Sequence, residues 1–450
     1  MKDEFTVGVL GLGHVGLPTA VGFAELGWFV LGWDDSLEKI ELIRAGISPF
    51  YEPGLQELLD SSISSGRFMV ASSAPDIISR ADILFVCVGT PQNEDGSADL
   101  SQIEKVAMDI SSYARTDKLV VEKSTTPVST AKRIKETIGR YKDPKVNIDV
   151  AVNPEFLREG TGIKDFFNPD RIVIGVETEK SSRTLQQLYE PIVKRLKNRV
   201  DDSGNEKIIV TDLNTAELIK HASNSFLAMK ISFINMVSDI CDVVGADVVK
   251  VALGMGMDPR IGLSFLNAGI GFGGYCLPKD INAFSKIGED LGVDMSIVRA
   301  VSTINNKRYE SVIRKLKSTL CVLRDKKIAV WGLSFKPETD DVREAPSIAI
   351  IKAMIAEGMI VKLHDPEAIE QFKEVLSPQH GLVEYCDSPE DACIGADCIL
   401  VLTEWKQYLD VDLMSVKKSM VNPLLIDGRN MFDPLKVSQI GFQYLGMGRS

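Results

Sequence analysis

The chain has 450 residues, of which 44% are hydrophobic and 25% charged, and its formal net charge at pH 7 is −12. This composition is typical of a globular protein and excludes disorder for most of a chain long enough for about three domains. An acidic chain without a block of lysine and arginine is a poor partner for nucleic acid or an anionic membrane. A small anionic ligand is still compatible, because a basic pocket can form locally.

Seven cysteines are spread along the chain without a CxxC pair. This pattern argues against a zinc ribbon, a redox dithiol and a disulfide scaffold. The chain shows no signal peptide and no apolar run of about 18 residues that could span a membrane. We therefore expect a cytosolic protein with reduced thiols and no metal site. Six cysteines are assigned to packing, and Cys276 is considered below.

The first half of the chain alternates short apolar runs with amphipathic segments. The apolar runs predict strands at 5–10, 28–33, 68–72, 83–88, 119–122 and 148–152, and helices are predicted between them, for example at 37–44 and 102–111. Short buried strands that alternate with helices are typical of parallel βαβ units. Residues 193–207 are charged and rich in turn formers, and are predicted to form a surface connection.

One long helix is predicted from Asn214 to about Val244, because this stretch contains neither glycine nor proline. Its length exceeds that of the usual globular helix and suggests a spine that joins two parts of the protein. Helices continue to about Ser318, and the βα alternation restarts at Lys327.

The sequence after Lys327 resembles the beginning of the chain at two places, which we call the two echoes. Residues 7–13 (VGVLGLG) resemble 328–333 (IAVWGL), and 81–90 (ADILFVCVGT) resemble 396–403 (ADCILVLT). Both echoes occur in the same order, which favours a repeated unit over chance. The sequence predicts an α/β protein with two Rossmann-like domains at 1–200 and 325–450, joined by the long helix and a helical domain at 210–318.

Residues 11–16 (GLGHVG) form a GxGxxG motif after the first predicted strand and at the start of a helix. Gly11 permits the tight turn, Gly13 lets the backbone approach a pyrophosphate, and Gly16 lets the helix pack on the strand. The helix N-terminus supplies unpaired amides and positive potential. A glycine turn without a nucleotide is the alternative, and His14 is interpreted as a spacer.

Asp34 ends the next predicted strand, 23 residues after Gly11. A carboxylate at this place accepts from a ribose 2′-hydroxyl and would repel a 2′-phosphate. The motif therefore predicts NAD rather than NADP. Asp35 is a second candidate for the ribose contact.

Lys220 and Asn224 are spaced i, i+4 and share one face of the long helix. One interpretation is a pair of donors aimed at developing negative charge. The other is a snorkelling lysine and a solvated asparagine. His221 points elsewhere and is interpreted as structural.

Residues 269–280 (GIGFGGYCLPKD) place four glycines shortly before Cys276. Such a loop can wrap closely around a ligand and present a thiol. Lys279 would favour the thiolate, and Asp280 could orient a water or a donor. A buried structural cysteine is the alternative.

Together these segments resemble the UDP-glucose 6-dehydrogenase family of nucleotide-sugar dehydrogenases over nearly the whole chain. The resemblance rests on GLGHVG (11–16), VGTP (88–91), EKST (122–125), NPEFLREG (153–160), Lys220 with Asn224, GFGGYCLPKD (271–280) and SFKPETDDVR (334–343). Chance does not produce all of these in this order.

The resemblance implies NAD-dependent oxidation of the primary alcohol of UDP-glucose to the carboxylate of UDP-glucuronate, with two NAD reduced and one water consumed. Cys276 would attack the intermediate aldehyde, giving a thiohemiacetal and then a thioester that is hydrolysed. Lys220 and Asn224 would stabilise the oxyanion. A water held by Asp280 or Lys220 would take the hydroxyl proton.

By the same resemblance, Glu155 with Thr125 would activate the hydrolytic water. The residues expected to hold NAD are Gly11, Gly13, His14, Val15, Gly16, Asp34, Thr90, Thr125, Glu159, Lys279 and Arg343. The residues expected to contact the nucleotide sugar are Glu155, Phe156, Leu157, Arg158, Glu159, Lys220, Asn224, Arg260, Phe265, Gly273, Phe335, Lys336 and Arg429.

The central domain would form a homodimer, with Arg260 contributed by the neighbouring subunit, and the C-terminal domain would bind the UDP-sugar. NPEFLREG matches the glucose-type members. Dehydrogenases of N-acetylated sugars usually carry arginine where Phe156 stands, and GDP-mannose dehydrogenases typically have serine where Gly160 stands. The sequence favours UDP-glucose, with GDP-mannose, UDP-galactose or a UDP-N-acetylhexosamine as alternatives.

Two hypotheses from other classes remain for comparison. A degenerate NAD-binding scaffold would lack the thiol, the lysine or the acid. A two-electron dehydrogenase of the 6-phosphogluconate or 3-hydroxyacid type would need neither Cys276 nor a second α/β domain.

Overall fold

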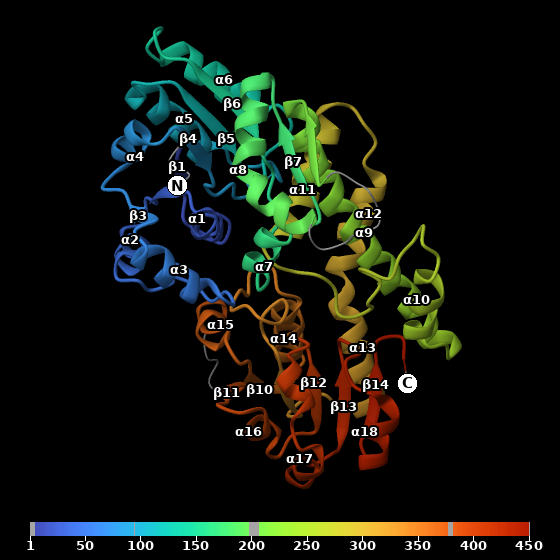
Figure 1. Ribbon diagram of the computed structural model, residues 1–450. Helices are drawn as coiled ribbons and strands as arrows, with labels where there is room; N and C mark the ends of the chain where they lie inside the picture. Colours follow the sequence, from blue (N-terminus) through green and yellow to red (C-terminus); the bar gives the residue numbers. More distant parts are fainter. Residues whose placement is uncertain (1–4, 94, 198–206, 377–380, 450) are drawn as a thin grey trace. The chain divides into compact units, whose positions relative to one another are not determined.

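The computed structural model describes residues 5–93, 95–197, 207–376 and 381–449. The chain divides into two compact units, 1–223 and 224–450, and the division falls within the 32-residue helix α9 (Leu213–Val244). Each unit contains one mainly parallel sheet, drawn in blue to green for the first unit and in orange to red for the second (Figure 1).

The first unit has an eight-stranded sheet in the order β3-β2-β1-β4-β5-β6-β7-β8. Its neighbouring strands are parallel except for the antiparallel pair β6–β7. The strands are β1 (Thr6–Leu10), β2 (Phe29–Trp33), β3 (Phe68–Val70), β4 (Ile83–Val86), β5 (Lys118–Glu122), β6 (Ile148–Val152), β7 (Ile172–Gly175) and β8 (Ile208–Thr211).

Helices cover both faces of this sheet. One face packs on α1 (Gly16–Glu25), α2 (Leu37–Arg44), α3 (Leu55–Ser64), α7 (Gly162–Phe167) and α8 (Glu179–Lys197), and the other on α4 (Ala74–Arg80), α5 (Ser101–Tyr113) and α6 (Thr130–Tyr141). In β1, Val7 and Val9 join one apolar core and Leu10 the other, because side chains alternate along a strand. The loops that follow parallel strands therefore open at one edge of the sheet, where ligands bind in such folds.

The predicted strands and helices of the first unit agree with the structure to within a few residues at each end. The surface connection predicted at 193–207 is wrong at its beginning, because α8 continues to Lys197. Leu185, Leu188 and Ile192 recur at helical spacing and pack on the sheet, so the charged residues that follow belong to the end of a helix. Residues 198–206 lie outside the described residues.

The second unit contains a helical segment and then a second sheet. After α9 come α10 (Val248–Gly256), α11 (Cys276–Asp290), α12 (Ser296–Asn306) and α13 (Arg308–Leu320). The six-stranded parallel sheet has the order β11-β10-β9-β12-β13-β14. Its strands are β9 (Lys327–Trp331), β10 (Ile360–His364), β11 (Val383–Tyr385), β12 (Cys398–Val401), β13 (Leu424–Asp427) and β14 (Gln443–Gly446).

The second sheet is also covered on both faces. One face packs on α13, α14 (Pro346–Ala356) and α15 (Ile369–Val375), and the other on α16 (Pro389–Cys393), the short helix η1 (Lys406–Leu409), α17 (Leu413–Ser419) and α18 (Pro434–Ile440). The order of its strands repeats the β3-β2-β1-β4-β5-β6 part of the first sheet, and the two pairs of similar segments correspond to β1 with β9 and β4 with β12. The predicted fold class, two Rossmann-like parts with a long helix between them, is confirmed.

No helix within the described residues combines the length and the apolar character needed to cross a bilayer. Five of the six cysteines assigned to packing are buried. The prediction is wrong for Cys321, which is exposed because it follows the last residue of α13 in a turn with φ of 59°. Burial raises the pKa of the Cys87 thiol to about 12 and that of Cys386 to about 11.

Candidate active site

The loop after β1 has the geometry of a dinucleotide-binding turn. Gly11 has φ of 92°, and a Cβ there would lie 2.6 Å from the carbonyl oxygen of Cys87. Helix α1 begins at Gly16, where a Cβ would lie 1.7 Å from the carbonyl oxygen of Gly11. The fold itself therefore requires both glycines, which bring the N-terminus of α1 to the end of β1.

Gly13 differs from its neighbours in the motif. A Cβ at Gly13 would have no heavy atom of the protein within 4 Å, and its φ lies outside the left-handed region. Neither packing nor backbone conformation demands a glycine here. The open space above Gly13 is where a pyrophosphate must approach the backbone, so this loop fits NAD.

Asp34 faces this loop. Its carboxylate is 6% exposed and accepts hydrogen bonds from Leu12 N at 2.7 Å and from Ser36 N at 2.9 Å. Each carboxylate oxygen has two lone pairs, so both keep capacity for a ribose hydroxyl. Asp35 is exposed, which leaves Asp34 as the carboxylate that the fold holds at the glycine loop.

Of the remaining predicted NAD ligands in this loop, Val15 is the residue before α1 and His14 stacks against Phe50 with ring centroids 4.1 Å apart. The segments that follow β4 and β5 lie beside each other. Thr90 Oγ1 donates to Thr125 O at 2.9 Å, and Ser124 Oγ donates to Val88 O at 2.7 Å. These bonds hold Thr125 at the edge of the sheet that also carries the glycine loop.

A buried ion pair joins α9 to the loop after β6. Lys220 Nζ lies 2.8 Å from Glu155 Oε1, and both side chains are at most 5% exposed. Glu155 Oε2 accepts from Leu157 N at 2.6 Å. Each charge thus has a close partner of opposite sign, which is the condition for keeping charges in a buried place. The structure brings together the lysine and the carboxylate that sequence reasoning assigned to one site.

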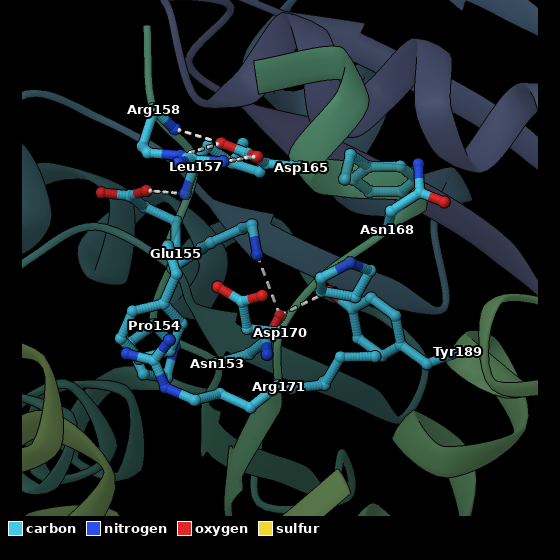
Figure 2. A pocket seen from close by; sticks show the side chains of 15 residues that line it. Asn153, Pro154, Glu155, Leu157, Arg158, Asp165, Asn168, Asp170, Arg171 and Tyr189 are labelled. Atoms are coloured by element: carbon cyan, nitrogen blue, oxygen red, sulfur yellow. Dashed lines mark hydrogen bonds and ion pairs between the residues drawn. The ribbon is translucent and has the colours of Figure 1, made fainter. Parts of the chain in front are cut away.

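An open pocket borders this pair (Figure 2). It is lined by residues 153–158, 165–166 and 168–172 together with Lys123 and Tyr189. Asn153 Oδ1 accepts from Lys123 Nζ at 3.0 Å and from Tyr189 Oη at 2.5 Å, which fixes the start of the NPEFLREG segment. Burial lowers the pKa of Lys123.

Phe156 lines this pocket and has two cations near its ring. The guanidinium of Arg171 stacks 3.7 Å from its ring centroid, and Lys220 Nζ lies 5.4 Å from it. The predicted substrate residue Arg158 is committed to Asp165, with Nε and Nη2 at 2.9 and 2.6 Å from its two oxygens. The lining therefore supplies both an aromatic face and basic groups, which suit an anionic ligand with a ring.

Sequence reasoning missed Glu52, which shapes the end of the same segment. Its buried carboxylate accepts from Gly160 N at 2.7 Å and from Gly162 N at 2.8 Å. Glu159, predicted to contact NAD, is half-buried on the stretch that Glu52 holds. No local motif marks Glu52, because its partners lie more than a hundred positions away in the chain.

In the second unit, Cys276 is the first residue of α11 and is half-buried. Asp280 follows one turn later and is 1% exposed. Its Oδ2 accepts from Asn224 Nδ2 at 2.6 Å, and its Oδ1 lies 3.0 Å from Lys279 Nζ. The structure therefore groups four of the predicted residues, and the free amides of the first helical turn favour negative charge beside Cys276.

Tyr275 precedes the cysteine and was not singled out by the sequence. Arg343 stacks on its ring at 4.6 Å and also forms two hydrogen bonds with Asp341, at 2.9 and 2.7 Å. Burial raises the pKa of the Tyr275 hydroxyl. Arg343, predicted to reach the NAD pyrophosphate, thus contacts the residue next to Cys276 in this unit.

Arg429 connects the glycine-rich segment 269–276, which leads to Cys276, to the loop after β9. Its guanidinium donates to the carbonyl oxygens of Leu402 at 2.8 Å, Gly271 at 2.9 Å and Phe335 at 3.2 Å. Its donors thus bind the backbone of these loops, and its Nε also lies 3.2 Å from Glu404 Oε2. The predicted contact of Arg429 with the nucleotide sugar stays a prediction. Lys336 Nζ lies 5.3 Å from the Phe335 ring.

Further hydrogen bonds hold the segment 269–276 in place, and no sequence motif predicted them. Arg308 Nε donates to Gly269 O at 2.7 Å, and Asn305 bonds both the N–H and the carbonyl of Phe272. Gly273 passes close to Glu344, since a Cβ there would lie 2.3 Å from the carbonyl oxygen of that residue. These contacts fix the path of the segment that leads to Cys276.

Two predicted residues lie apart from these groups. The side chain of Arg260 is 87% exposed and pairs with Asp258 at 2.6 Å. Phe265 lies on the loop after α10 with φ of 65°. Within this chain, neither forms a hydrogen bond or ion pair with residues 269–280 among those that the structure describes.

Sequence models of three protein-family domains match this chain, one after the other. They are the NAD binding domain at residues 5–193, the central domain at 214–307 and the UDP binding domain at 329–434 of the UDP-glucose/GDP-mannose dehydrogenase family. The chain belongs to the UDP-glucose/GDP-mannose dehydrogenase family. As a member, it is an NAD-dependent dehydrogenase, and the glycine loop with Asp34 lies in its NAD binding domain.

Relatives and solved structures agree with this membership. The chain is 43% identical to UDP-glucose 6-dehydrogenase YwqF of Bacillus subtilis (strain 168) over 98% of this chain and 97% of that protein. It is 39% identical to UDP-glucose 6-dehydrogenase of Pseudomonas aeruginosa over 98% and 97% of the two chains. The structure of a UDP-glucose dehydrogenase from Pyrobaculum islandicum matches with a TM-score of 0.89 at 37% identity, covering 99% of this chain and 98% of that one.

Proposed function

We propose that this member of the family oxidises UDP-glucose to UDP-glucuronate through a covalent intermediate on Cys276. The observation that carries the proposal is the thiol at the first turn of α11 beside the buried Asn224–Asp280 pair. The relatives named UDP-glucose 6-dehydrogenase, which match over nearly the whole chain, support the substrate. NAD, when bound, accepts the hydride released in each of the two oxidations.

In the first oxidation, the 6-hydroxyl gives its proton to a water held by Asp280 or Lys220. Loss of the hydride from C6 gives the aldehyde. Cys276 Sγ then loses its proton and forms a bond to the aldehyde carbon, and the former carbonyl oxygen takes up a proton to become the thiohemiacetal hydroxyl. The Asn224 amide and the Lys220 ammonium, one turn apart on α9, donate to this oxygen while it carries negative charge. Asp280 orients the Asn224 amide, because it accepts from Nδ2 at 2.6 Å.

The second oxidation removes a hydride from the thiohemiacetal carbon and a proton from its hydroxyl, and it leaves a thioester, which water must hydrolyse. Glu155, assisted by Thr125, takes a proton from this water as its oxygen attacks the thioester carbon. The C–S bond then breaks, and the electron pair returns to Cys276 Sγ. The buried position of Glu155 and its contact with Lys220 support this role, because the contact holds the carboxylate in one place beside the proposed oxyanion donor.

The thiol tests the proposal most directly. Cys276→Ser should lower steady-state NADH formation by at least about 100-fold, about 2.7 kcal/mol of activation free energy, because a serine hydroxyl is a poor nucleophile here. NADH should be followed by absorbance, and UDP-glucuronate by chromatography. Cys321→Ser is the matched control, since it replaces the same sulfur at an exposed site. Full turnover in Cys276→Ser would contradict the covalent mechanism and favour a two-electron dehydrogenase.

The substrate needs a separate assay of the wild-type protein. NADH formation should be compared for UDP-glucose, UDP-galactose, two UDP-N-acetylhexosamines and GDP-mannose, with NADH counted per sugar consumed. We expect UDP-glucose to have the highest kcat/KM and to yield two NADH. Activity on GDP-mannose alone would overturn the substrate, and one NADH per sugar would overturn the double oxidation.

We also propose that the protein is a cytosolic homodimer with an NAD binding domain at 1–200, a dimerising helical domain at 210–318 and a UDP-sugar domain at 325–450. The matched family models cover corresponding ranges. On α9, exposed apolar side chains recur at the spacing of a coiled-coil seam: Phe226, Met236 and Ile240 are among them, together with Phe233 and Val243. This seam suits a second copy of the helix, and the exposed Arg260 would then serve the partner's site.

Sedimentation equilibrium tests the dimer. The wild-type protein should sediment as a dimer, and Phe233→Glu together with Ile240→Glu should yield monomers, because two charges in the seam oppose its burial. Leu291→Glu, which adds a charge at an exposed apolar residue outside α9, is the control. A wild-type monomer at micromolar concentration would refute the proposed dimer.

A further inference from the structure

Two buried carboxyl groups lie beside the segment that carries Thr125. Glu122 is the last residue of β5 and is 0% exposed, and Glu217 lies near the start of α9 and is 3% exposed. Among the described residues, no lysine or arginine forms an ion pair with either of them. Two carboxyl groups that meet in a buried place cannot both be ionised at modest cost.

The hydrogen bonds favour Glu217 as the charged member of the pair, although burial raises its pKa as well. Glu217 Oε1 accepts from Ala131 N at 2.8 Å and its Oε2 accepts from Ser129 N at 2.6 Å. Both oxygens of Glu217 are therefore acceptors at the start of α6, as a carboxylate requires. Glu122 Oε1 accepts from Thr126 Oγ1 at 2.5 Å.

The second oxygen of Glu122 receives no hydrogen bond from any donor group among the described residues. The two carboxyl groups are nevertheless close enough for each to affect the pKa of the other, and both bind the turn at 126–131. A hydrogen bond between two carboxyl groups needs one proton, and Glu122 is the group with an oxygen free to hold it. Burial, followed by the charge of Glu217, raises the pKa of Glu122 well above its usual range.

Three residues of α9 bind the segment, and Asn214 is one of them, since its Oδ1 accepts from Ser129 Oγ at 3.5 Å. Glu217 holds Ser129 and Ala131, and His221 Nε2 lies 2.7 Å from Thr126 O, where only an N–H can bond. Lys220 lies between these two residues in the sequence of α9. The titratable groups that face the pair are thus each other and, across Thr126, His221, while Lys123 and Lys220 turn to Asn153 and Glu155.

We propose that Glu122 and Glu217 share one proton and act as a positioning pair, which holds the Thr125 segment against the part of α9 that carries Lys220. The proposal rests on the roles given to Thr125 and Lys220 in the proposed function. Loss of the shared proton leaves two like charges in a buried contact, and the segment is then expected to separate from α9.

The direction of the pH dependence follows from the raised pKa of Glu122. Its contribution to stability is fully present below the pKa of an unfolded glutamic acid, 4.5. The contribution is lost as pH rises from there through the raised value in the folded protein. We therefore expect both the stability of the first unit and kcat to fall on the alkaline side.

The same substitution at the two positions should have opposite results. In Glu122→Gln, the amide can donate to Glu217 and its carbonyl can accept from Thr126, so the pair is kept without a titratable proton. In Glu217→Gln, the amide group would face a backbone N–H of Ser129 or Ala131, two donors in contact. We expect Glu217→Gln to lower kcat at least about tenfold and Glu122→Gln to remain active with a flatter alkaline limb.

Three measurements test the pair without reference to the substrate. Thermal unfolding at a series of pH values should show Glu122→Gln gaining stability relative to wild type as pH rises. The infrared carbonyl band of a protonated carboxylic acid should be present in the wild type at neutral pH and reduced in Glu122→Gln. Hydrogen exchange of a peptide covering 125–131, corrected for intrinsic rates, should accelerate in alkaline wild type but not in Glu122→Gln.

Glu104→Gln is the matched control, because Glu104 is an exposed carboxylate that pairs with Arg133 on α6. It should leave the alkaline limb unchanged. Parallel pH dependence of wild type and Glu122→Gln, with the same infrared band in both, would overturn the shared proton. If the wild-type protein fails on every sugar nucleotide, the proposed function falls, while unfolding, infrared and exchange still decide whether the pair exists.

Discussion

The two sheets of this protein begin with the same hydrogen bonds but use them differently. In the first, Leu12 N donates to Asp34 Oδ2 at 2.7 Å, and in the second, Leu333 N donates to Asp365 Oδ2 at 2.7 Å. Each aspartate directly follows the strand beside the first strand of its unit, β2 for Asp34 and β10 for Asp365. The weak sequence echo between the two halves therefore reflects an equivalent turn in three dimensions.

The likeness extends to the opposite end of the same strands. Asp82 Oδ2 accepts the N–H of Thr6 at 2.9 Å, and Asp397 Oδ2 accepts the N–H of Lys327 at 2.9 Å. Both aspartates come from the Ala-Asp pair that precedes the next strand of the sheet. The backbone framework of the two halves is thus held by the same local chemistry.

The difference lies in what remains for a ligand. Asp365 accepts from the N–H groups of Leu333, Ser334, Glu367 and Ala368, from Ser334 Oγ and from Trp405 Nε1. Donors of the protein itself therefore use the acceptor capacity of the Asp365 carboxylate, whereas Asp34 keeps capacity for a ligand. In the first unit α1 begins at Gly16, directly after the glycine turn, but in the second α14 begins only at Pro346. A shared topology therefore does not carry over the ability to bind a dinucleotide.

The largest effect is expected when the first loop is given the residue of the second. Ser334 is the equivalent of Gly13, and a side chain at Gly13 would meet no protein atom within 4 Å. Gly13→Ser should therefore fold normally but place its hydroxymethyl group where the pyrophosphate approaches. We expect the KM for NAD to rise at least about 100-fold, about 2.7 kcal/mol.

Initial rates of NADH formation measure this KM, and calorimetry measures the unfolding temperature of the same variant. Ser334→Gly is the reciprocal control, which should leave the KM for NAD unchanged. A Gly13→Ser protein with a normal KM would mean that the open space beside Gly13 does not receive the dinucleotide, and the comparison of the two loops would fail.

Much of this comparison could be predicted from sequence. The apolar runs located the strands of the first sheet, and the GxGxxG motif with Asp34 indicated the dinucleotide loop because each residue has a local reason to be there. The two sequence echoes correctly indicated a repeated unit. These features depend on residues close in sequence, where periodicity and turn chemistry decide the structure.

The hydrogen bonds that occupy the Asp365 carboxylate could not be predicted in this way. Both Asp34 and Asp365 directly follow a strand after a glycine turn, and what separates them includes a donor from Trp405, forty positions away. The same limit applies to Glu217 and Glu52, whose backbone partners lie 86 to 110 positions distant. Arg429 is a further example, since it bonds to the carbonyl oxygens of Gly271 and Phe335, which lie 158 and 94 positions away, and no local pattern indicates these bonds.

Asp365→Asn tests whether the second aspartate serves the fold. The new amide group would face backbone N–H donors, and buried hydrogen bonds to a charged acceptor would be lost. We expect a loss of about 2–3 kcal/mol in the free energy of unfolding, with no direct effect on the KM for NAD. Urea unfolding measures the first quantity and initial rates the second.

Asp34→Asn provides the contrast for this prediction. It should destabilise the protein less, because Asp34 has fewer hydrogen bonds to lose, and it should weaken NAD more. Equal losses of stability in the two variants, or a raised KM for NAD in Asp365→Asn alone, would remove the distinction between a ligand-binding and a structural aspartate.

The smallest effect concerns the residue before each aspartate, Trp33 in the first sheet and His364 in the second. Burial lowers the pKa of His364 below its ordinary value of 6.5, although the charge of Asp365 opposes this. The neutral histidine thus contributes stability that is present above about pH 6.5 and is lost as pH falls through the lowered value in the folded protein. Trp33 cannot titrate, so this acid sensitivity belongs to the second sheet.

His364→Gln should remove this loss, because glutamine keeps a polar group near Tyr408 Oη, which lies 3.1 Å from Nδ1, without taking up a proton. The unfolding temperature of the variant should fall less than that of the wild type between about pH 7.5 and pH 5.5, by a difference worth under about 1 kcal/mol. Identical acid slopes in the two proteins would show that His364 is protonated as easily in the folded protein as in the unfolded chain. In that case water would reach the carboxyl end of β10, although protein donors occupy the carboxylate of Asp365 there.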